Sequence, residues 1–197
     1  MTMLYYEDLT IMPNQEVPVN FLIKKVMTVI HLICVESEHC TGAVNLGLGF
    51  PQYNKEEKNL GSVIRLFAYS NDILRNATCD HRMQRLDDYI RKGEILEVPS
   101  DIREYVQYKR IQFKTNKERL MRRYAKRHNM DIGQVENLYV GYSPQKENLP
   151  YVTMDSLSSG LRFRLYIDEV KQLENSSPLI FNCYGLTVSG SLPYFNN

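Results

Sequence analysis

The sequence predicts an α+β fold. Segments with the two-residue period of strands alternate with segments of helical period through the first hundred residues. A turn-forming cluster at 99–101 then precedes a second group of strands around a basic helix. The 197 residues, 43% of them hydrophobic, are enough to bury a core without disulfide bonds. We therefore expect two domains, 1–101 and 102–197.

The first domain is expected to contain six elements. In order, they are a strand over 3–11, a helix from Pro18 to about Glu36, strands over 44–50 and 62–68, a helix over 71–78 and a strand over 95–98. The first helix is recognised by hydrophobic residues at helical spacing, from Leu22 to Ile33. The order β-α-β-β-α-β is that of a ferredoxin-like unit. This order predicts an architecture and leaves the activity open.

The second domain is expected to open with a strand over 104–114, whose two-residue period places Arg110 and Gln112 on one face. The capping box Thr115-Asn-Lys-Glu118 then starts a helix over 116–128. A short helix near 131–139 follows, and the remaining elements are strands over 150–155, 161–167 and 179–184.

The formal net charge of +1 hides a concentrated cationic segment. Residues 109–128 contain nine Lys or Arg and one acidic residue, which is a local charge of +8, so the rest of the chain carries −7. A segment of this kind is the electrostatic footprint of a polyanionic partner.

On the predicted basic helix, five cations share one face at spacings of i, i+3, i+4, i+7 and i+8. They are Arg119, Arg122, Arg123, Lys126 and Arg127. We expect Leu120 and Tyr124 to pack on the other side, and no acidic residue to pair with this cationic stripe. Such a row can follow the phosphates of duplex RNA, while Arg110 and Gln112 are residue types that bond guanine and adenine edges. An ordinary solvated helix face is the alternative.

His31 belongs to the polar face of the first helix, together with Lys24 and Thr28. At 100° per residue, Leu22 lies about 180° from His31, and Val26, Val29 and Ile33 lie about 140–160° from it. A buried core histidine is therefore disfavoured. The residues alone leave two interpretations open, a catalytic imidazole and a plain surface histidine.

Several classes of function have no support in the sequence. The cluster of His31, Cys34, His39 and Cys40 matches no common zinc spacing, and there is no nucleophile elbow, P-loop or HExxH motif. We therefore expect no metal and no cofactor. The four cysteines form no CxxC pair, and neither a signal peptide nor an apolar run of about 20 residues is present. These features predict a cytoplasmic protein with no membrane association.

Four stretches, in their order and spacing, resemble a known family. They are Val29-Ile-His31-Leu with Leu46-Gly-Leu-Gly-Phe-Pro51, Arg110-Ile-Gln112-Phe-Lys-Thr-Asn-Lys-Glu-Arg119, Ser156-x-Ser-Ser-Gly-x-x-Phe163-Arg-Leu, and Cys183-Tyr184-Gly-Leu with Gly190-x-x-Pro193-Tyr-Phe195. Together they resemble the CRISPR-associated repeat-processing endoribonuclease of the type I-F (Csy) system, the f subtype of the Cas-six family. The resemblance implies a ferredoxin-like (RAMP-type) amino-terminal domain and an RNA-binding carboxyl-terminal domain with an arginine-rich helix.

The resemblance also implies roles for individual residues. His31 would be the catalytic imidazole, Ser156 would hold the attacking ribose hydroxyl, and Tyr184 would orient His31. Phe163 would stack on the terminal base pair of a repeat hairpin, and Ser158 would contact the RNA. In addition, Arg110 and Gln112 would read the lowest base pairs, and Arg119, Arg122, Arg123, Lys126 and Arg127 would hold stem phosphates. The sequence departs from the arginine-richest family pattern at Met121 and Lys126.

The expected chemistry is cleavage by a ribose 2′-hydroxyl of the substrate, which gives a 2′,3′-cyclic phosphate without metal. The expected partners are the repeat hairpin and other subunits of the Cascade complex, among them the backbone protein next to the 3′ end of the guide RNA. No homo-oligomer is expected. A catalytically inactive RNA-binding subunit and a DNA-binding module are the alternatives, and the latter leaves Ser156 and Tyr184 unexplained.

Overall fold

The computed structural model describes residues 4–113, 117–143, 148–156, 159–174 and 178–195. Packing divides the chain into a larger unit, which joins 1–111 to 149–197, and a smaller unit, 112–148. The chain is therefore not divided at the expected boundary near residue 101. Below, each unit is described by itself.

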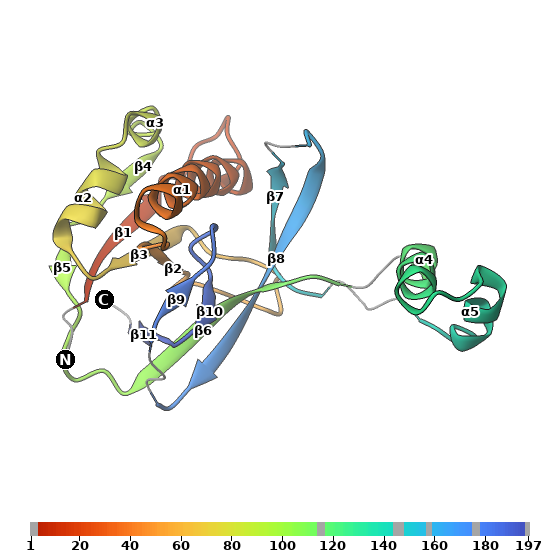
Figure 1. Cartoon of the computed structure of the whole chain (residues 1–197). Coiled ribbons are helices and arrows are strands. Elements are labelled where there is room, and N and C mark those ends of the chain that lie inside the picture. Colours follow the sequence, from red (N-terminus) through yellow and green to blue (C-terminus); the bar gives the residue numbers. More distant parts are fainter. Residues whose placement is uncertain (1–3, 114–116, 144–147, 157–158, 175–177, 196–197) are drawn as a thin grey trace. The chain divides into compact units, whose positions relative to one another are not determined.

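The first sheet of the larger unit is antiparallel in all its pairings, with the strand order β2-β3-β1-β4 and β5 paired to β1 (Figure 1). Its strands are β1 (Tyr5–Ile11), β2 (Gly47–Gly49), β3 (Val63–Ala68), β4 (Ile90–Lys92) and β5 (Leu96–Glu97). The α+β class is thereby confirmed, because helices and antiparallel sheets are combined in one chain. The finer assignment to a ferredoxin-like architecture stays a prediction.

Three helices belong to the larger unit, and α1 and α2 pack against the first sheet (Figure 1). Helix α1 (Val19–Thr41) continues beyond the expected end near Glu36 and ends at Gly42, which adopts a left-handed φ of 74°. Helix α2 (Asn71–Thr78) covers the predicted helical residues, and the Ser70 side chain caps its start. A further short helix, α3 (His81–Gln84), was not predicted from the sequence.

The second sheet has the strand order β11-β6-β8-β7 and is also antiparallel. Its strands are β6 (Glu104–Ile111), β7 (Tyr151–Asp155), β8 (Arg162–Gln172) and β11 (Leu192–Tyr194). Strand β8 runs past its expected end at residue 167, because its second part, 166–172, pairs with β6. The expectation that Gln112 lies on the same strand as Arg110 is wrong, since β6 ends at Ile111.

One hydrophobic core runs through both sheets of the larger unit. Leu9 and Ile30, from the first hundred residues, are fully buried in the same cluster as Leu165 and Leu192. Arg65 adds a buried polar link, since it forms paired hydrogen bonds with Asp8 and donates to a backbone oxygen near the end of the chain. This shared core explains why residues near 101 do not separate two packing units.

The smaller unit consists of α4 (Lys117–His128) and α5 (Ile132–Leu138). Its core is a cluster of the buried residues Met121, Ala125 and Val135. The expectation that Leu120 and Tyr124 form the packed side of α4 is only partly right, because both are half-buried whereas Met121 and Ala125 are buried. In the part of the chain that the structure describes, no helix is both long and apolar enough to span a membrane.

Candidate functional site

His31 lies on α1 and is half-buried. Its Nδ1 atom is 2.7 Å from the carbonyl oxygen of Cys183. A carbonyl oxygen only accepts hydrogen bonds, so Nδ1 must carry the proton and donate it. In the neutral ring, Nε2 is then the nitrogen without a proton. The geometry therefore gives His31 a tautomer that can accept a proton at Nε2.

Tyr184 fixes the plane of the His31 ring. The two rings are stacked, with centroids 4.4 Å apart and an angle of 12° between their planes. Burial raises the pKa of the Tyr184 hydroxyl, while the neighbouring Arg110 cation opposes that shift. Tyr184 therefore contributes a neutral ring to this stack.

Phe163 and Arg110 extend the stack on the second sheet, from the neighbouring strands β8 and β6. Phe163 meets Tyr184 edge to face at 6.3 Å between centroids. The Arg110 guanidinium lies 5.2 Å from the centroid of Tyr184 and 5.7 Å from that of Phe163. We call these four residues, His31, Tyr184, Phe163 and Arg110, the His31 cluster. Four predicted site residues, which are far apart in the sequence, thus lie in one continuous group.

Ser156 lies directly after β7, at the start of a turn closed by hydrogen bonds from the Ser156 amide to Leu161 and from Gly160 to Ser156. The Ser159 hydroxyl donates to the Ser156 hydroxyl oxygen at 2.8 Å. The other predicted serine of this turn, Ser158, lies outside the described residues.

An ion pair connects the Ser156 turn with the helix of His31. Asp155, the residue before Ser156, is 2.5 Å from Lys24 on α1. Lys24 precedes His31 by seven residues on the same helix face, which is about 10 Å along the axis. The structure therefore places this turn beside the α1 face that carries His31.

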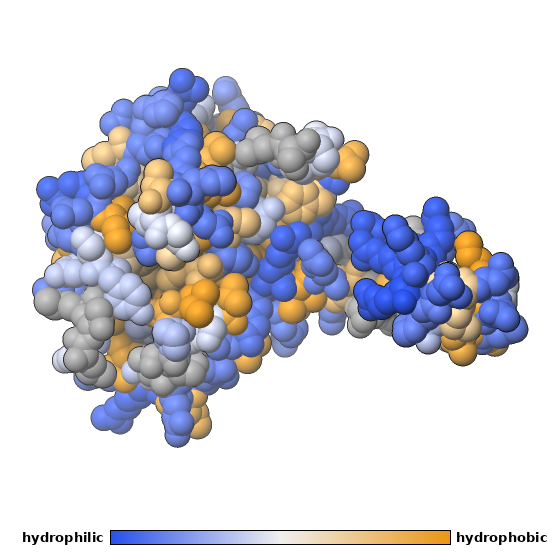
Figure 2. Space-filling model, in the orientation of Figure 1, coloured by the Kyte–Doolittle hydropathy of each residue, from blue (hydrophilic) through white to orange (hydrophobic). Residues whose placement is uncertain are grey.

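The cationic stripe of α4 is exposed along its whole length. Its members are Arg119, Arg122, Arg123, Lys126 and Arg127. The space-filling view shows a hydrophilic surface over α4 (Figure 2). The expectation that no acidic residue pairs with the stripe is wrong, because Glu118 lies 3.6 Å from Arg122 at the i,i+4 position. Both side chains are largely exposed, so this pair leaves the stripe strongly cationic. Gln112 is also exposed.

Among the described residues, no group of three or more His, Cys, Asp and Glu side chains is placed to hold a metal ion. Cys34, the thiol one turn after His31, is fully buried, and burial raises its pKa to about 12. Burial therefore keeps the Cys34 side chain in the neutral thiol form.

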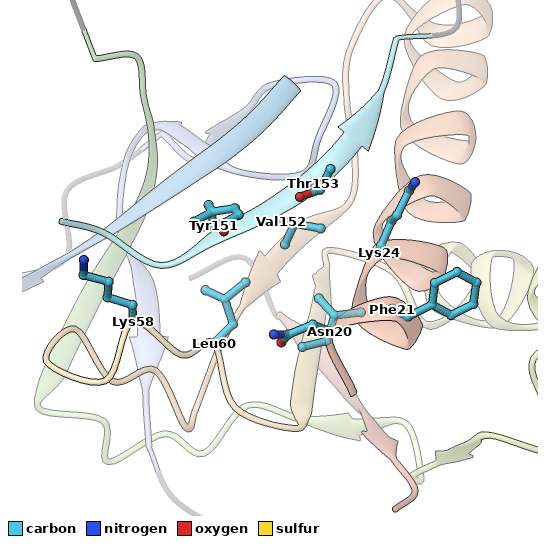
Figure 3. A pocket seen from close by; sticks show the side chains of 9 residues that line it. Asn20, Phe21, Lys24, Lys58, Leu60, Tyr151, Val152 and Thr153 are labelled. Carbon is cyan, nitrogen blue, oxygen red and sulfur yellow. The ribbon is translucent and has the colours of Figure 1, made fainter. Parts of the chain in front are cut away.

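A hollow of about 500 Å³ lies between α1, β7 and the loop before β3 (Figure 3). Lys24 and Phe21 border it on the helix, Lys58 and Leu60 on the loop, and Tyr151 on the strand. None of the predicted site residues lines it. The His31 cluster is therefore not a part of this hollow.

Two contributions to the site were missed in the sequence. The backbone oxygen of Cys183 is the partner that sets the His31 tautomer, and the Asn182 side chain holds the turn that presents this oxygen. A hydrogen bond between the side chain of His31 and the main chain of Cys183 leaves no mark in composition or periodicity. Asn182 followed by Gly185 is a turn signal that could have directed attention to this segment.

The chain is similar to known proteins over nearly its whole length. Residues 6–195 match the family model described as CRISPR-associated protein (Cas_Csy4). A protein named CRISPR-associated endonuclease Cas6/Csy4, from Pseudomonas aeruginosa (strain UCBPP-PA14), is 30% identical over 191 residues, covering 97% of this chain and 99% of that protein. A second protein of that name, from Escherichia coli (strain UTI89 / UPEC), is 26% identical over 191 residues, with the same coverage of 97% and 99%.

Proposed function

The chain belongs to the Cas_Csy4 family of CRISPR-associated proteins, and on this premise we propose that it is a metal-independent endoribonuclease that cuts CRISPR precursor RNA at the base of the repeat hairpin. One observation carries the proposal. The Cys183 oxygen holds Nδ1 of His31 as a donor at 2.7 Å and thereby leaves Nε2 as a proton acceptor. The two relatives, which are both named as endonucleases, support the same class of activity.

In the proposed reaction, the attacking group is the 2′-hydroxyl of the nucleotide before the cut. Its proton passes to Nε2 of His31, and O2′ forms a bond to the adjacent phosphorus. The bond from phosphorus to the 5′-oxygen breaks, and that oxygen takes up a proton. The products are a 2′,3′-cyclic phosphate and a 5′-hydroxyl. Ser156 would hold the attacking hydroxyl, and Tyr184 would keep the imidazole plane in position.

Binding and cutting use different residues in this proposal. Arg119, Arg122, Arg123, Lys126 and Arg127 would hold stem phosphates, Arg110 and Gln112 would read the lowest base pairs, and Ser158 and Phe163 would contact the end of the stem. After the cut, the enzyme would stay on its product as a subunit of the type I-F Cascade complex, next to the backbone protein at the 3′ end of the guide RNA.

The test is a cleavage assay on cognate repeat RNA in EDTA, with the wild type, His31→Ala and, as a control, His39→Ala on the exposed end of the same helix. We expect the wild type and His39→Ala to cut at similar rates and His31→Ala to be slower by about a thousandfold. RNA with a 2′-deoxy nucleotide at the cut should bind and remain intact.

The same assay separates the proposal from its main alternative, an inactive RNA-binding subunit. If the wild type binds the hairpin without cutting it in EDTA or with Mg²⁺, the alternative is correct. If it cuts only with Mg²⁺, the activity stands and the metal-independent mechanism is lost. If His31→Ala cuts at the rate of the wild type, His31 is not the base.

A further inference from the structure

We propose that Asn182 is a positioning residue, whose side-chain oxygen sets the tautomer and the ring plane of His31 through the turn 182–186. This proposal rests on the function proposed above, because it concerns the residue that positions His31, the proposed general base. Asn182 itself makes no measured contact with the His31 ring in the described structure. Its effect would pass through the backbone of the turn.

The turn 182–186 contacts His31 twice. It connects β9 (Ile180–Phe181) with β10 (Thr187–Ser189), which pair antiparallel. The carbonyl of Cys183 accepts the Nδ1 hydrogen bond, and the ring of the next residue, Tyr184, stacks on the imidazole. A shift of this turn would therefore change both the protonated nitrogen and the plane of the ring.

The side chain of Asn182 stabilises the turn by hydrogen bonds to the backbone of the turn itself. Its side-chain oxygen accepts hydrogen bonds from the amide of Tyr184 at 2.9 Å and from the amide of Leu186 at 3.2 Å. Both partners are N–H donors, so the amide group must present its oxygen to them. The backbone of Asn182 adds a donation to Leu186 and accepts one from Gly185. The Tyr184 amide and the Cys183 carbonyl belong to one peptide unit, so the Asn182 side chain directly fixes the unit whose oxygen accepts from His31, and it also fixes the Gly185–Leu186 unit.

Contacts with β2 and with the core also hold the turn in place. The position of the turn therefore determines the position of the atoms that contact His31. The carbonyl of Gly185 accepts a hydrogen bond from the amide of Leu48 at 2.8 Å. Gly185 has a φ of 73°, and a Cβ there would lie 2.8 Å from the Leu48 side chain. Leu186 is fully buried. The turn thus sits against β2 in one orientation, and Asn182 supplies the internal bonds that this orientation needs.

The variants are Asn182→Leu, which keeps the approximate size and removes the acceptor oxygen, and Asn182→Asp, which keeps the acceptor. Asn14→Leu is the matched control, because Asn14 accepts from two amides in the same manner in the loop before α1. The first readout is the ¹⁵N spectrum of the His31 imidazole, assigned with His31→Ala among the four histidines. This readout requires no RNA, so it remains informative even if the protein does not cut.

We expect the wild type, Asn182→Asp and Asn14→Leu to hold the proton of the neutral ring on Nδ1, and Asn182→Leu to show a mixture of the two tautomers. On repeat RNA, the single-turnover rate of Asn182→Leu should fall about 10- to 100-fold, while the dissociation constant for uncut 2′-deoxy RNA changes less than about threefold. Asn182→Asp should keep the rate within a few-fold of the wild type.

Two results would overturn the proposal: an unchanged His31 tautomer in folded Asn182→Leu, or equal losses of rate in Asn182→Leu and Asn182→Asp. By contrast, if the wild type does not cut RNA, the proposed function is wrong. The tautomer measurement then still tests the proposed role of Asn182. A folded state for each variant is checked by the amide spectrum of the fully buried residues, such as Ile30 and Leu165.

Discussion

The two packing units differ in how tightly they hold their candidate functional residues. In the larger unit, His31 is fixed by a hydrogen bond of 2.7 Å and by a ring stacked at 12°, and its helix packs on the core that both sheets share. In the smaller unit, the five cations of the stripe are exposed on a helix pair whose core comprises Met121, Ala125 and Val135.

This difference agrees with the physical demands of the two proposed tasks. Proton transfer requires a defined nitrogen at hydrogen-bond distance from the reacting group, and small displacements are costly. Attraction to phosphates depends mainly on charge and tolerates movement of the side chains. We infer that disrupted packing in the larger unit should slow cutting. Disrupted packing in the smaller unit should weaken binding.

The largest effect expected on binding concerns the cationic stripe. Arg119→Ala combined with Arg123→Ala should weaken binding of hairpin RNA about 100-fold at moderate salt, because two phosphate contacts are removed. The slope of log affinity against log salt should fall by about two. The measurement is a salt series of dissociation constants. Arg75→Ala with Arg91→Ala, two exposed cations of the larger unit, is the control. Equal slopes for all three proteins would exclude the stripe as the phosphate contact.

The second prediction compares the cores. Met121→Ala should destabilise the small cluster by about 2 kcal/mol, the lower end for a buried methionine, because little else covers the site. Hydrogen exchange should then accelerate about 30-fold in α4 and α5 and remain unchanged in the larger unit. Ile30→Ala, in the shared core, should instead accelerate exchange throughout the larger unit. A global effect of Met121→Ala would show that the two units unfold together.

The third prediction concerns Arg110, which belongs to the larger unit and is nevertheless proposed to bind RNA. Arg110→Ala should weaken cognate hairpin binding about tenfold, because a base contact is lost. For a hairpin in which the lowest base pair is exchanged, Arg110→Ala should reduce the affinity by a smaller factor. Arg110→Lys should behave like Arg110→Ala in this comparison, since lysine lacks the planar fork. Equal losses on both hairpins would mean that Arg110 contacts phosphate rather than a base.

The smallest effect is a pH dependence confined to the larger unit. Hydrogen bonds from Arg82 lower the pKa of Asp80 to about 2, and Arg82 also pairs with Glu36 on α1. A lowered folded-state pKa means that this stabilisation is present above pH 3.8 and is lost as the pH falls toward 2. Urea unfolding should show that Asp80→Asn costs about 1 kcal/mol at pH 6 and almost nothing at pH 2. A constant difference at both values would contradict this role of the carboxylate.

Local features of the fold were readable from the sequence. The residues of α2 were recognised from their helical pattern, and the structure adds that Ser70 caps the start of this helix. The helical period placed His31 with Lys24 on the polar face of α1, and both residues are half-buried. The buried face nevertheless lies closer to His31 than the period predicted, because Met27 and Cys34 are fully buried. The basic helix was also located, because a capping-box sequence precedes five cations at helical spacing.

Features that depend on distant contacts were not readable. Met121 is buried because α5 packs over it, which the period of α4 alone does not reveal. The packing units do not divide near residue 101, because β6 pairs with β8 and β11 from the end of the chain. The partner of His31 is a backbone oxygen 152 residues away in the chain. No side-chain pattern encodes such a contact.

The most direct test of the division between cutting and binding measures two quantities on one repeat RNA. These are the single-turnover cutting rate at saturating enzyme and the dissociation constant of the uncut 2′-deoxy form. For His31→Ala, we predict a rate about a thousandfold lower with a dissociation constant within about threefold of the wild type. For Arg119→Ala with Arg123→Ala, we predict the reverse, with weaker binding and a nearly normal rate at saturation. If His31→Ala cuts normally, or if loss of the arginines abolishes cutting at saturation, the division is contradicted.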